Sequence, residues 1–421
     1  MRTRTECRSR VVITGLGAVT PLGITADTFW TNLCAGRSGV SAIRLFDAST
    51  FRSRIAGQVC DQAVCDIVGR KLARRMDRFA LFGLAAAREA WQSARLCIDD
   101  LDPYEVGVLI GSSHGGEHAL MAEMDTILHG NLRHVSPRLI PRLLSNMAAV
   151  QVGIDLGLRG PSFSLGSACA TGAQSIGEAA EIIRRGDAQV MLCGGAEACI
   201  TPLTIAGDQA AGALSYRNDA PERASRPFDA GRDGFVLAEG AGVLVLEAYE
   251  HARQRGAPIL AELTAYATTC DALHETHPEG TGLHAARAIT RALSKADLAA
   301  PDIDAVFAHA TSTVVGDRAE TQVLYLALGD KAECIPVTAI KSAIGHPLAA
   351  AGAIQAVAVV KALQAQTLPP LLNLETPDPA CHLNFVVGQT QPTPLDYVLS
   401  NSFGFGGHNV ALIFGSMDDD V

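Results

Sequence analysis

Short apolar runs that end near glycine alternate with alanine-rich stretches along the whole chain, and this alternation constrains the fold most strongly. The runs at 10–14 and 190–193 have the length of buried strands, and Gly15 and Gly194 follow them directly. The alanine-rich stretches between such runs have helical periodicity. Strands that alternate with helices in this way predict an α/β fold.

The same alternation begins again after about residue 255. An apolar run at 259–268 is followed by a helical stretch near 283–298 and by a second strand-like run at 303–309. A chain of 421 residues is too long for one simple core, and no long Pro/Ser linker divides it. We therefore predict two similar α/β halves packed against each other, residues 1–255 and 256–421.

Composition indicates an ordinary soluble protein and excludes several classes. No apolar segment is expected to reach the roughly 18 residues that cross a bilayer, and the basic N-terminus lacks the apolar core of a signal peptide. Its 11 cysteines, an odd number, are scattered, which favours a reducing cytoplasm. The net charge of −10 opposes nucleic-acid binding unless a local basic patch intervenes.

One such patch lies at residues 70–78 and includes Lys71, Arg74 and Arg75. Composition leaves two alternatives open, a solvated helix face or a docking site for an acidic partner.

Two motifs that suggest other chemistry fail on spacing. The run at 11–23 resembles a dinucleotide-binding loop, but Thr20 occupies the position of its third glycine and Pro21 disturbs a helix start. His274 and His277 are one residue too close for a zinc-protease helix, and no cysteine pair has a partner at zinc-site spacing. We predict neither a nicotinamide nor a metal site.

The stretch "SACATGAQSIG" at 167–177 places Cys169 between an extended segment and a helix whose first turns carry no charge. Free N–H groups and the helix dipole at such a junction favour a thiolate. Position alone still leaves a buried structural thiol as the commoner alternative.

Three other features supply what a nucleophile needs. His309 closes a strand-like run, and His346 lies between a strand and an alanine-rich helix, five residues after Lys341. The glycine-rich turn around Phe405 exposes backbone N–H groups, which can form an oxyanion hole.

Cys169 at its junction, "HATST", "KSAIGH" and "NSFGFGG" in this order resemble the β-ketoacyl-acyl-carrier-protein synthases of the thiolase superfamily, ketosynthase II branch. The match runs along essentially the whole chain and also fits ketosynthase subunits of type II polyketide systems. It implies a thiolase-like fold of duplicated α/β halves in α-β-α-β-α layers. The activity it implies is decarboxylative Claisen condensation of an acyl thioester with malonyl-carrier protein, in fatty-acid or polyketide synthesis.

The resemblance also implies residue roles. Cys169 carries the acyl chain, and His309 and His346 assist decarboxylation and stabilise the enolate, in a division of labour left open. Lys341 is expected to be held by Glu320 as an ion pair, with Asp317 as a further supporting residue. The backbone N–H groups of Cys169 and Phe405 form the oxyanion hole, and Phe405 gates it. Further residues are expected to hold the phosphopantetheine arm (Thr311, Thr313), line the acyl pocket (His114, Asp208, Thr276) and dock the carrier protein (Lys71, Arg74, Arg75).

His114 and Asp208 occupy positions that are commonly apolar in ketosynthase II relatives. Either both side chains turn to water, or the pocket takes a shorter or more polar chain or is shared with another subunit. Ala310 and His408 are further departures, because many relatives have glycine and threonine there.

The resemblance implies no cofactor beyond the carrier's own arm, and a homodimer or a heterodimer with a chain-length-factor-like subunit. A non-catalytic partner subunit is disfavoured because Cys169, His309 and His346 are all present. A nicotinamide-linked oxidoreductase is disfavoured by the failed glycine loop.

Overall fold

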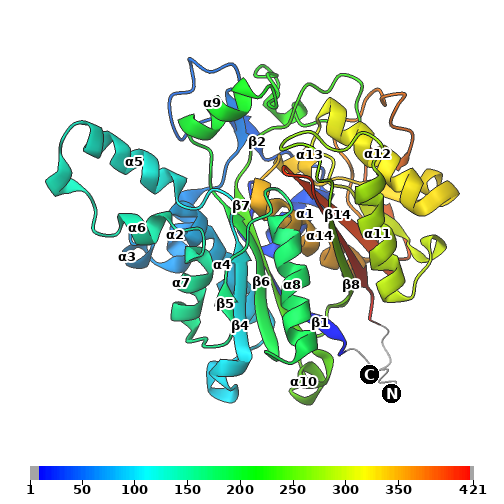
Figure 1. Cartoon of the computed structure of the whole chain (residues 1–421), viewed down its shortest axis with the longest axis horizontal. Helices are drawn as coiled ribbons and strands as arrows, with labels where there is room; N and C mark the ends of the chain where they lie inside the picture. The colour runs from blue at the N-terminus through cyan, green and yellow to red at the C-terminus, as the bar shows by residue number, and fades with distance from the viewer. Residues whose placement is uncertain (1–8, 418–421) are drawn as a thin grey trace.

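The computed structural model describes residues 9–417, and its central feature is a sheet of eleven strands in the order β12-β10-β9-β14-β15-β8-β1-β7-β6-β4-β5 (Figure 1). Two short sheets pair β2 with β3 and β11 with β13. The strands are β1 (Val11–Val19), β2 (Val40–Ala42), β3 (Ile55–Gly57), β4 (Val106–Gly111), β5 (Ser162–Phe163), β6 (Val190–Glu197), β7 (Gly240–Ala248), β8 (Ala261–Cys270), β9 (Ala305–Phe307), β10 (Pro336–Thr338), β11 (Thr367–Leu368), β12 (Asn384–Phe385), β13 (Gln391–Pro392), β14 (Tyr397–Gly404) and β15 (His408–Gly415).

The large sheet consists of two halves with the same topology. Outward from the centre, β1, β7, β6, β4 and β5 form one half, and β8, β15, β14, β9 and β10 form the other, with β12 added at its edge. If the five strands of each half are numbered 1 to 5 along the chain, both halves have the same spatial order, 1-5-4-2-3. The halves join where Val12 pairs with Glu262 and Ile13 with Ala261. The predicted duplicated α/β fold is confirmed, whereas the boundary at residue 255 stays a prediction.

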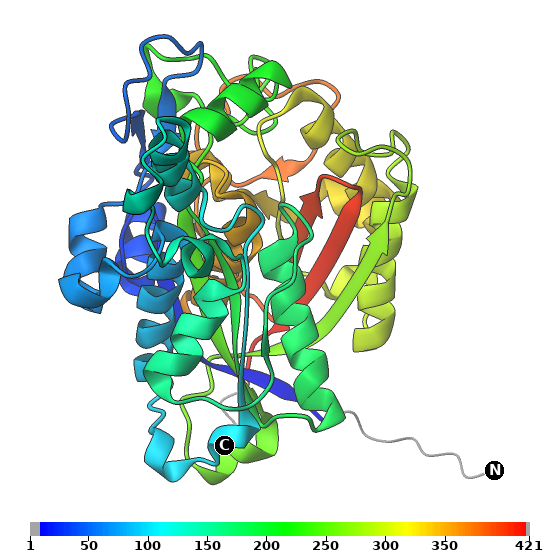
Figure 2. The same cartoon turned by 60° about the vertical axis from the view of Figure 1, so that its left-hand side comes forward.

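Helices cover the outer faces of both halves and fill the space between them. The α-helices are α1 (Ala26–Cys34), α2 (Asp61–Val68), α3 (Arg70–Ala73), α4 (Arg78–Ser93), α5 (Glu117–Leu128), α6 (Leu139–Leu143), α7 (Met147–Leu156), α8 (Thr171–Arg185), α9 (Pro202–Ala210), α10 (Tyr249–Gln254), α11 (Leu283–Ala296), α12 (Val314–Leu328), α13 (Lys341–Ile344) and α14 (Ala351–Ala365). Figures 1 and 2 show the N-terminal half, blue to green, gathered on one side and the C-terminal half, yellow to red, on the other.

Alternate side chains of each strand enter different cores, which produces the expected layers. Leu192 packs with α4 and α7 on one face of β6, whereas its neighbour Cys193 faces the central core with α8 and α14. Beyond the C-terminal half, α11 and α12 form the opposite outer layer. The two central helices lie close together, because a Cβ added at Gly352 would be 2.8 Å from the Cβ of Ala173.

One sequence expectation about this core is wrong. Residues 348–365, which include α14, are long and apolar enough to cross a membrane, although no such segment was expected. In the fold 83% of this stretch is buried, which identifies it as the core helix between the two halves. Residues 1–8, which begin the basic N-terminal stretch, lie outside the described residues.

Candidate active site

A cavity of about 440 Å³ opens where strand ends of the two halves meet, and it gathers the side chains on which the sequence prediction depends. Its wall includes Cys169, His309, His346 and Phe405. These residues come from the start of α8, the segment after β9, the segment before α14 and the β14–β15 turn. The fold therefore brings together four positions that are far apart in the sequence.

Cys169 lies two residues before α8, on a strained turn. Ala168 has a φ of 48°, in the left-handed region that alanine seldom adopts. The Ser113 hydroxyl donates a hydrogen bond of 3.0 Å to the Ala168 carbonyl, and Ala170 is the N-cap of the helix. This turn directs the half-buried thiol into the cavity.

Burial of the thiol opposes the thiolate that the helix start favours. Burial raises the pKa of Cys169 to about 12. The positive charge of Lys341 and a hydrogen bond from the Phe405 backbone N–H lower that pKa, while Asp208 raises it further. Desolvation of the sulfur therefore outweighs the groups that favour the anion.

The two histidines face each other across the cavity. Their ring centroids are 5.5 Å apart with an interplanar angle of 87°, and Phe235 and Phe403 contact them edge-on from either side. Burial, reinforced by the charge of Lys341, holds the pKa of both His309 and His346 well below the usual range. Both imidazoles are therefore neutral, and neither Nδ1 atom has a hydrogen-bond partner among residues 9–417.

The expected ion pair between Lys341 and Glu320 is wrong. The Glu320 carboxylate accepts hydrogen bonds from the backbone N–H groups of His309 (2.8 Å) and Ala310 (2.6 Å), and within the described chain no ion pair joins it to Lys341. These two N–H groups lie beside the left-handed turn at Ala310, where φ is 31°. Glu320 thus fixes the His309 loop directly and acts on Lys341 only at longer range, where it raises the pKa that burial lowers to about 8.

The turn at 404–407 brings the backbone N–H of Phe405 close to the Cys169 sulfur. A Cβ added at Gly404 would lie 3.2 Å from the Cys169 nitrogen, so the turn and the nucleophile are in close contact. The Gly406 N–H donates to the Glu275 carbonyl (2.7 Å), and the Asp271 N–H donates to the Gly407 carbonyl (2.9 Å). Phe405 itself is 45% exposed at the cavity.

Two family models match most of the described chain. A family model for the "Beta-ketoacyl synthase, N-terminal domain" matches residues 8–252, and one for the corresponding C-terminal domain matches residues 260–375. The chain belongs to the β-ketoacyl synthase family. It is a condensing acyltransferase, as the sequence resemblance predicted.

Relatives of this synthase match it over almost their whole length. The 3-oxoacyl-[acyl-carrier-protein] synthase 2 of Synechocystis is 46% identical, covering 97% of this chain and 98% of the relative. That of Coxiella burnetii is 42% identical, covering 98% and 100%. A solved ketosynthase in complex with its type II polyketide acyl-carrier protein has a TM-score of 0.90 at 35% identity, covering 97% and 100%. The ishigamide ketosynthase/chain length factor has a TM-score of 0.91 at 32% identity, covering 98% and 100%.

Other predicted site residues of the synthase surround the cavity or support its wall. Thr311 and Thr313 line the cavity with their hydroxyl oxygens 3.0 Å apart, and exposed Thr276 lies at its rim. Asp317 does not line it; its buried carboxylate accepts from the Ser312 N–H (3.1 Å) and pairs with Arg232 (3.2 Å). His114 and Asp208 both lie in the cavity wall.

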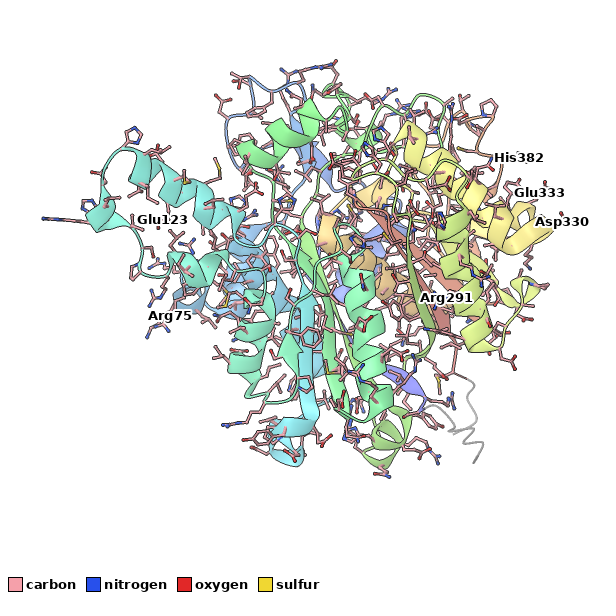
Figure 3. The ribbon with its side chains drawn as sticks, viewed as in Figure 1. Arg75, Glu123, Arg291, Asp330, Glu333 and His382 are labelled. Carbon is pink, nitrogen blue, oxygen red and sulfur yellow. The ribbon has the colours of Figure 1, made fainter. Side chains whose placement is uncertain are left out.

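The basic patch divides into an exposed part and a buried part. Lys71, Arg74 and Arg75 are exposed on α3 and the turn after it, and Figure 3 shows Arg75 on the outer surface of this region. Arg78, quoted with the same patch, instead forms ion pairs with buried Glu239 (2.5 Å) and with Asp61 (2.7 Å).

The sequence prediction missed three residues that shape the site. Glu117 holds His114, Ser113 holds the strained turn before Cys169, and Phe235 packs against His346. Of these three residues, only Glu117 could have been found from the sequence. It follows His114 by three residues where a helix begins, and residues at this spacing lie next to each other on a helix. Over residues 9–417 no cluster of three or more His, Cys, Asp or Glu side chains could hold a metal ion.

Proposed function

We propose that this synthase catalyses decarboxylative condensation of an acyl thioester on Cys169 with malonyl-carrier protein. One observation carries the proposal: a single cavity holds the Cys169 thiol, in close contact with the backbone of the 404–407 turn, together with two buried neutral imidazoles. Thioester exchange needs the first arrangement, and stabilisation of an enolate needs the second.

In the first half-reaction the Cys169 sulfur attacks the acyl thioester of the carrier protein. A carbon–sulfur bond forms to Cys169, the bond to the carrier's sulfur breaks, and the thiol proton passes to the departing carrier thiolate. The N–H groups of Cys169 and Phe405 receive the negative oxygen of the tetrahedral intermediate. Because the resting thiol has a pKa of about 12, attack and proton loss must be coupled.

In the second half-reaction malonyl-carrier protein loses carbon dioxide, and the electrons of the broken carbon–carbon bond become the enolate. Neutral His309 and His346 serve as hydrogen-bond donors to the enolate oxygen, and the Lys341 charge stabilises it electrostatically. The enolate carbon attacks the acyl group on Cys169. Collapse of the intermediate expels the Cys169 thiolate, which takes up a proton, and leaves a 3-oxoacyl-carrier protein.

The deciding experiment compares Cys169→Ala with Cys97→Ala, an exposed cysteine outside the cavity wall. Loss of condensation by on the order of a thousandfold or more is expected only in the first variant, because the acyl intermediate cannot form. Iodoacetamide should inactivate the wild type with its label on Cys169. Retained condensation by Cys169→Ala would show that the mechanism is wrong.

The partner surfaces belong to the same proposal. Exposed Lys71, Arg74 and Arg75 offer an acidic carrier protein a local positive site on an acidic enzyme. The substrates bring their own phosphopantetheine arm, held by Thr311 and Thr313, and we place the reaction in the cytoplasm without a resident cofactor.

A homodimer is supported by the apolar surface beside the sheet edge. Leu128 (75% exposed), Leu132 (66%) and Ile154 (72%) lie on or next to α5 and α7, and Phe163 (42%) lies on β5, the edge strand. Figure 1 shows α5 and α6 extending from the body of the molecule. An exposed edge strand with apolar neighbours favours pairing with a second copy.

A second candidate is the ketosynthase subunit of a type II polyketide system that works with a chain-length-factor partner. The polar residues His114 and Asp208 in the cavity favour it. Extension assays with octanoyl- and palmitoyl-carrier protein separate the two: efficient elongation of the long saturated chain by the purified homodimer identifies fatty-acid synthesis and excludes the polyketide alternative.

A further inference from the structure

The peptide bond between Ala168 and Cys169 joins a hydrogen-bonded carbonyl to a donor of the proposed oxyanion hole. It contains the Ala168 carbonyl and the Cys169 N–H. A trans peptide is planar, and its C=O and N–H point in opposite directions. The Cys169 nitrogen also lies against the 404–407 turn, because a Cβ added at Gly404 would be 3.2 Å from it. Any group that fixes the direction of the Ala168 carbonyl therefore also fixes the direction of the Cys169 N–H beside that turn.

The backbone at this peptide unit needs a tether because it is strained. Ala168 has a φ of 48°, and a return to the ordinary α or β region would rotate the peptide plane together with the Cys169 N–H. The Thr171 N–H donates to the Ala168 carbonyl (3.1 Å), but this bond lies within the same turn and moves with it. It cannot hold the turn in place relative to the rest of the cavity wall.

Ser113 provides a tether from outside the turn. Its hydroxyl donates a hydrogen bond of 3.0 Å to the Ala168 carbonyl, across 55 positions of the sequence. Ser113 lies two residues after β4 and lines the same cavity as the nucleophile. Because this bond joins two separate segments, it fixes the peptide plane relative to the central sheet.

A buried carboxyl group holds the backbone of Ser113 in turn. Glu197 ends β6, which pairs with β4, and its side chain is fully buried. Its oxygens accept hydrogen bonds from the Ser113 N–H (2.9 Å), the Ser112 hydroxyl (2.8 Å) and the His114 N–H (3.3 Å). Three bonds to one buried side chain leave this segment little freedom to move. The Ser113 hydroxyl is therefore held in place before any substrate binds.

We propose that Ser113 is a positioning residue for the oxyanion hole. Its hydroxyl, anchored through Glu197, directs the Cys169 N–H toward the oxygen of the tetrahedral intermediate. A donor stabilises that oxygen only when it is aimed at the position the oxyanion will occupy. This role rests on the proposed acyl transfer to Cys169, and it is tested at that step.

The test variant is Ser113→Ala, which removes the hydroxyl at an exposed position. Acyl transfer is measured in single turnovers as the mass gained by Cys169, with acetyl- and octanoyl-carrier protein. We expect both chains to react about 10- to 100-fold more slowly and by similar factors, because a misdirected N–H weakens stabilisation of the oxyanion from any acyl group. Ser113→Thr keeps the hydroxyl and should retain most of the rate.

Two further rates separate this role from a general loosening of the site. Alkylation of Cys169 by iodoacetamide creates no oxyanion, and malonyl decarboxylation depends on His309 and His346. Both rates should stay within about twofold of wild type in Ser113→Ala, because neither transition state uses the Cys169 N–H. The matched control is Ser41→Ala, which removes a hydroxyl that donates to the Ala42 carbonyl (3.5 Å) outside the cavity wall and should leave every rate unchanged.

Each outcome separates the role of Ser113 from the general mechanism. If neither chain acylates the wild type, the proposed function fails and the role of Ser113 fails with it. If the wild type is acylated and Ser113→Ala reacts as fast, the role is overturned and the condensation mechanism stands. The role is also overturned by an equal loss of acyl transfer, alkylation and decarboxylation, by an equal loss in Ser113→Thr, or by slowing of only one acyl chain. Slowing of acyl transfer alone, for both chains and only without the hydroxyl, supports both.

Discussion

Gly404→Ala tests whether the close contact between the 404–407 turn and the nucleophile positions the oxyanion hole. The added Cβ would lie 2.5 Å from the Ser167 carbonyl oxygen and 3.1 Å and 3.2 Å from the nitrogens of Ala170 and Cys169. Ordinary contacts of this kind are near 3.5 Å, so the end of β14 or the Cys169 turn must move by about 1 Å.

Two effects of different size follow from that displacement. Overpacking of a well-packed contact costs about 1–3 kcal/mol in the free energy of unfolding, which the synthase can survive. The Phe405 N–H moves with the turn, and a displacement of about 1 Å at a reacting centre reduces the rate by on the order of 100-fold. We therefore expect a folded enzyme with a modestly lowered Tm and a large loss in acyl transfer.

The measurement is the rate of acyl transfer to Cys169 beside a thermal melt, with Gly166→Ala as the matched control. Gly166 is exposed three residues before the nucleophile, and no atom of residues 9–417 would lie within 4 Å of its added Cβ. The control should keep its acyl-transfer rate within about twofold. If Gly404→Ala acylated as fast as the control, the contact would not position the oxyanion hole.

Three further predictions follow from the same structure. Lys341→Met removes the charge that, together with burial, lowers the pKa of His309 and His346. Both imidazoles should then take up protons at higher pH, and the acid limb of the pH profile for malonyl decarboxylation should shift upward. The measurement is carbon dioxide release against pH in the wild type and the variant, and an unchanged profile would mean that Lys341 is only a packing residue. Arg74→Glu with Arg75→Glu should raise KM for the acyl-carrier protein about tenfold or more at low salt with little change in kcat, and an unchanged KM would remove this patch from the docking site. Phe163→Lys at the β5 edge should shift the synthase toward monomer in analytical ultracentrifugation, whereas a dimer of unchanged affinity would place the interface elsewhere.

The sequence could predict the two α/β halves and the position of Cys169 because both depend on local patterns. Periodicity and glycine punctuation mark where strands end, and residues at strand ends tend to gather at one edge of a sheet. The same patterns could not show that β1 meets β8 over two residue pairs, since pairing between the halves depends on the whole assembled core.

The sequence could not predict the protonation states of the site residues, and the reason is different. A helix start predicts a thiolate at Cys169, yet desolvation decides its pKa, and burial exists only in the folded chain. The sequence could not identify the partners of Glu320, because a carboxylate can bind either a lysine or backbone N–H groups. The left-handed turn at Ala310 presents two such groups to it, and a sequence shows no φ angle.

At rest the reacting groups of the site are neutral, and one cation lies near them. Cys169 is a neutral thiol, His309 and His346 are neutral imidazoles, and Lys341 is the nearby cation that lowers the pKa of all three. A direct ion pair with Glu320 would neutralise that cation at close range and weaken its effect on an enolate. Because Glu320 is instead occupied by backbone N–H groups, the Lys341 charge remains available to stabilise the enolate when decarboxylation creates it. The Lys341 charge therefore stabilises the anionic transition state more than it stabilises the resting site.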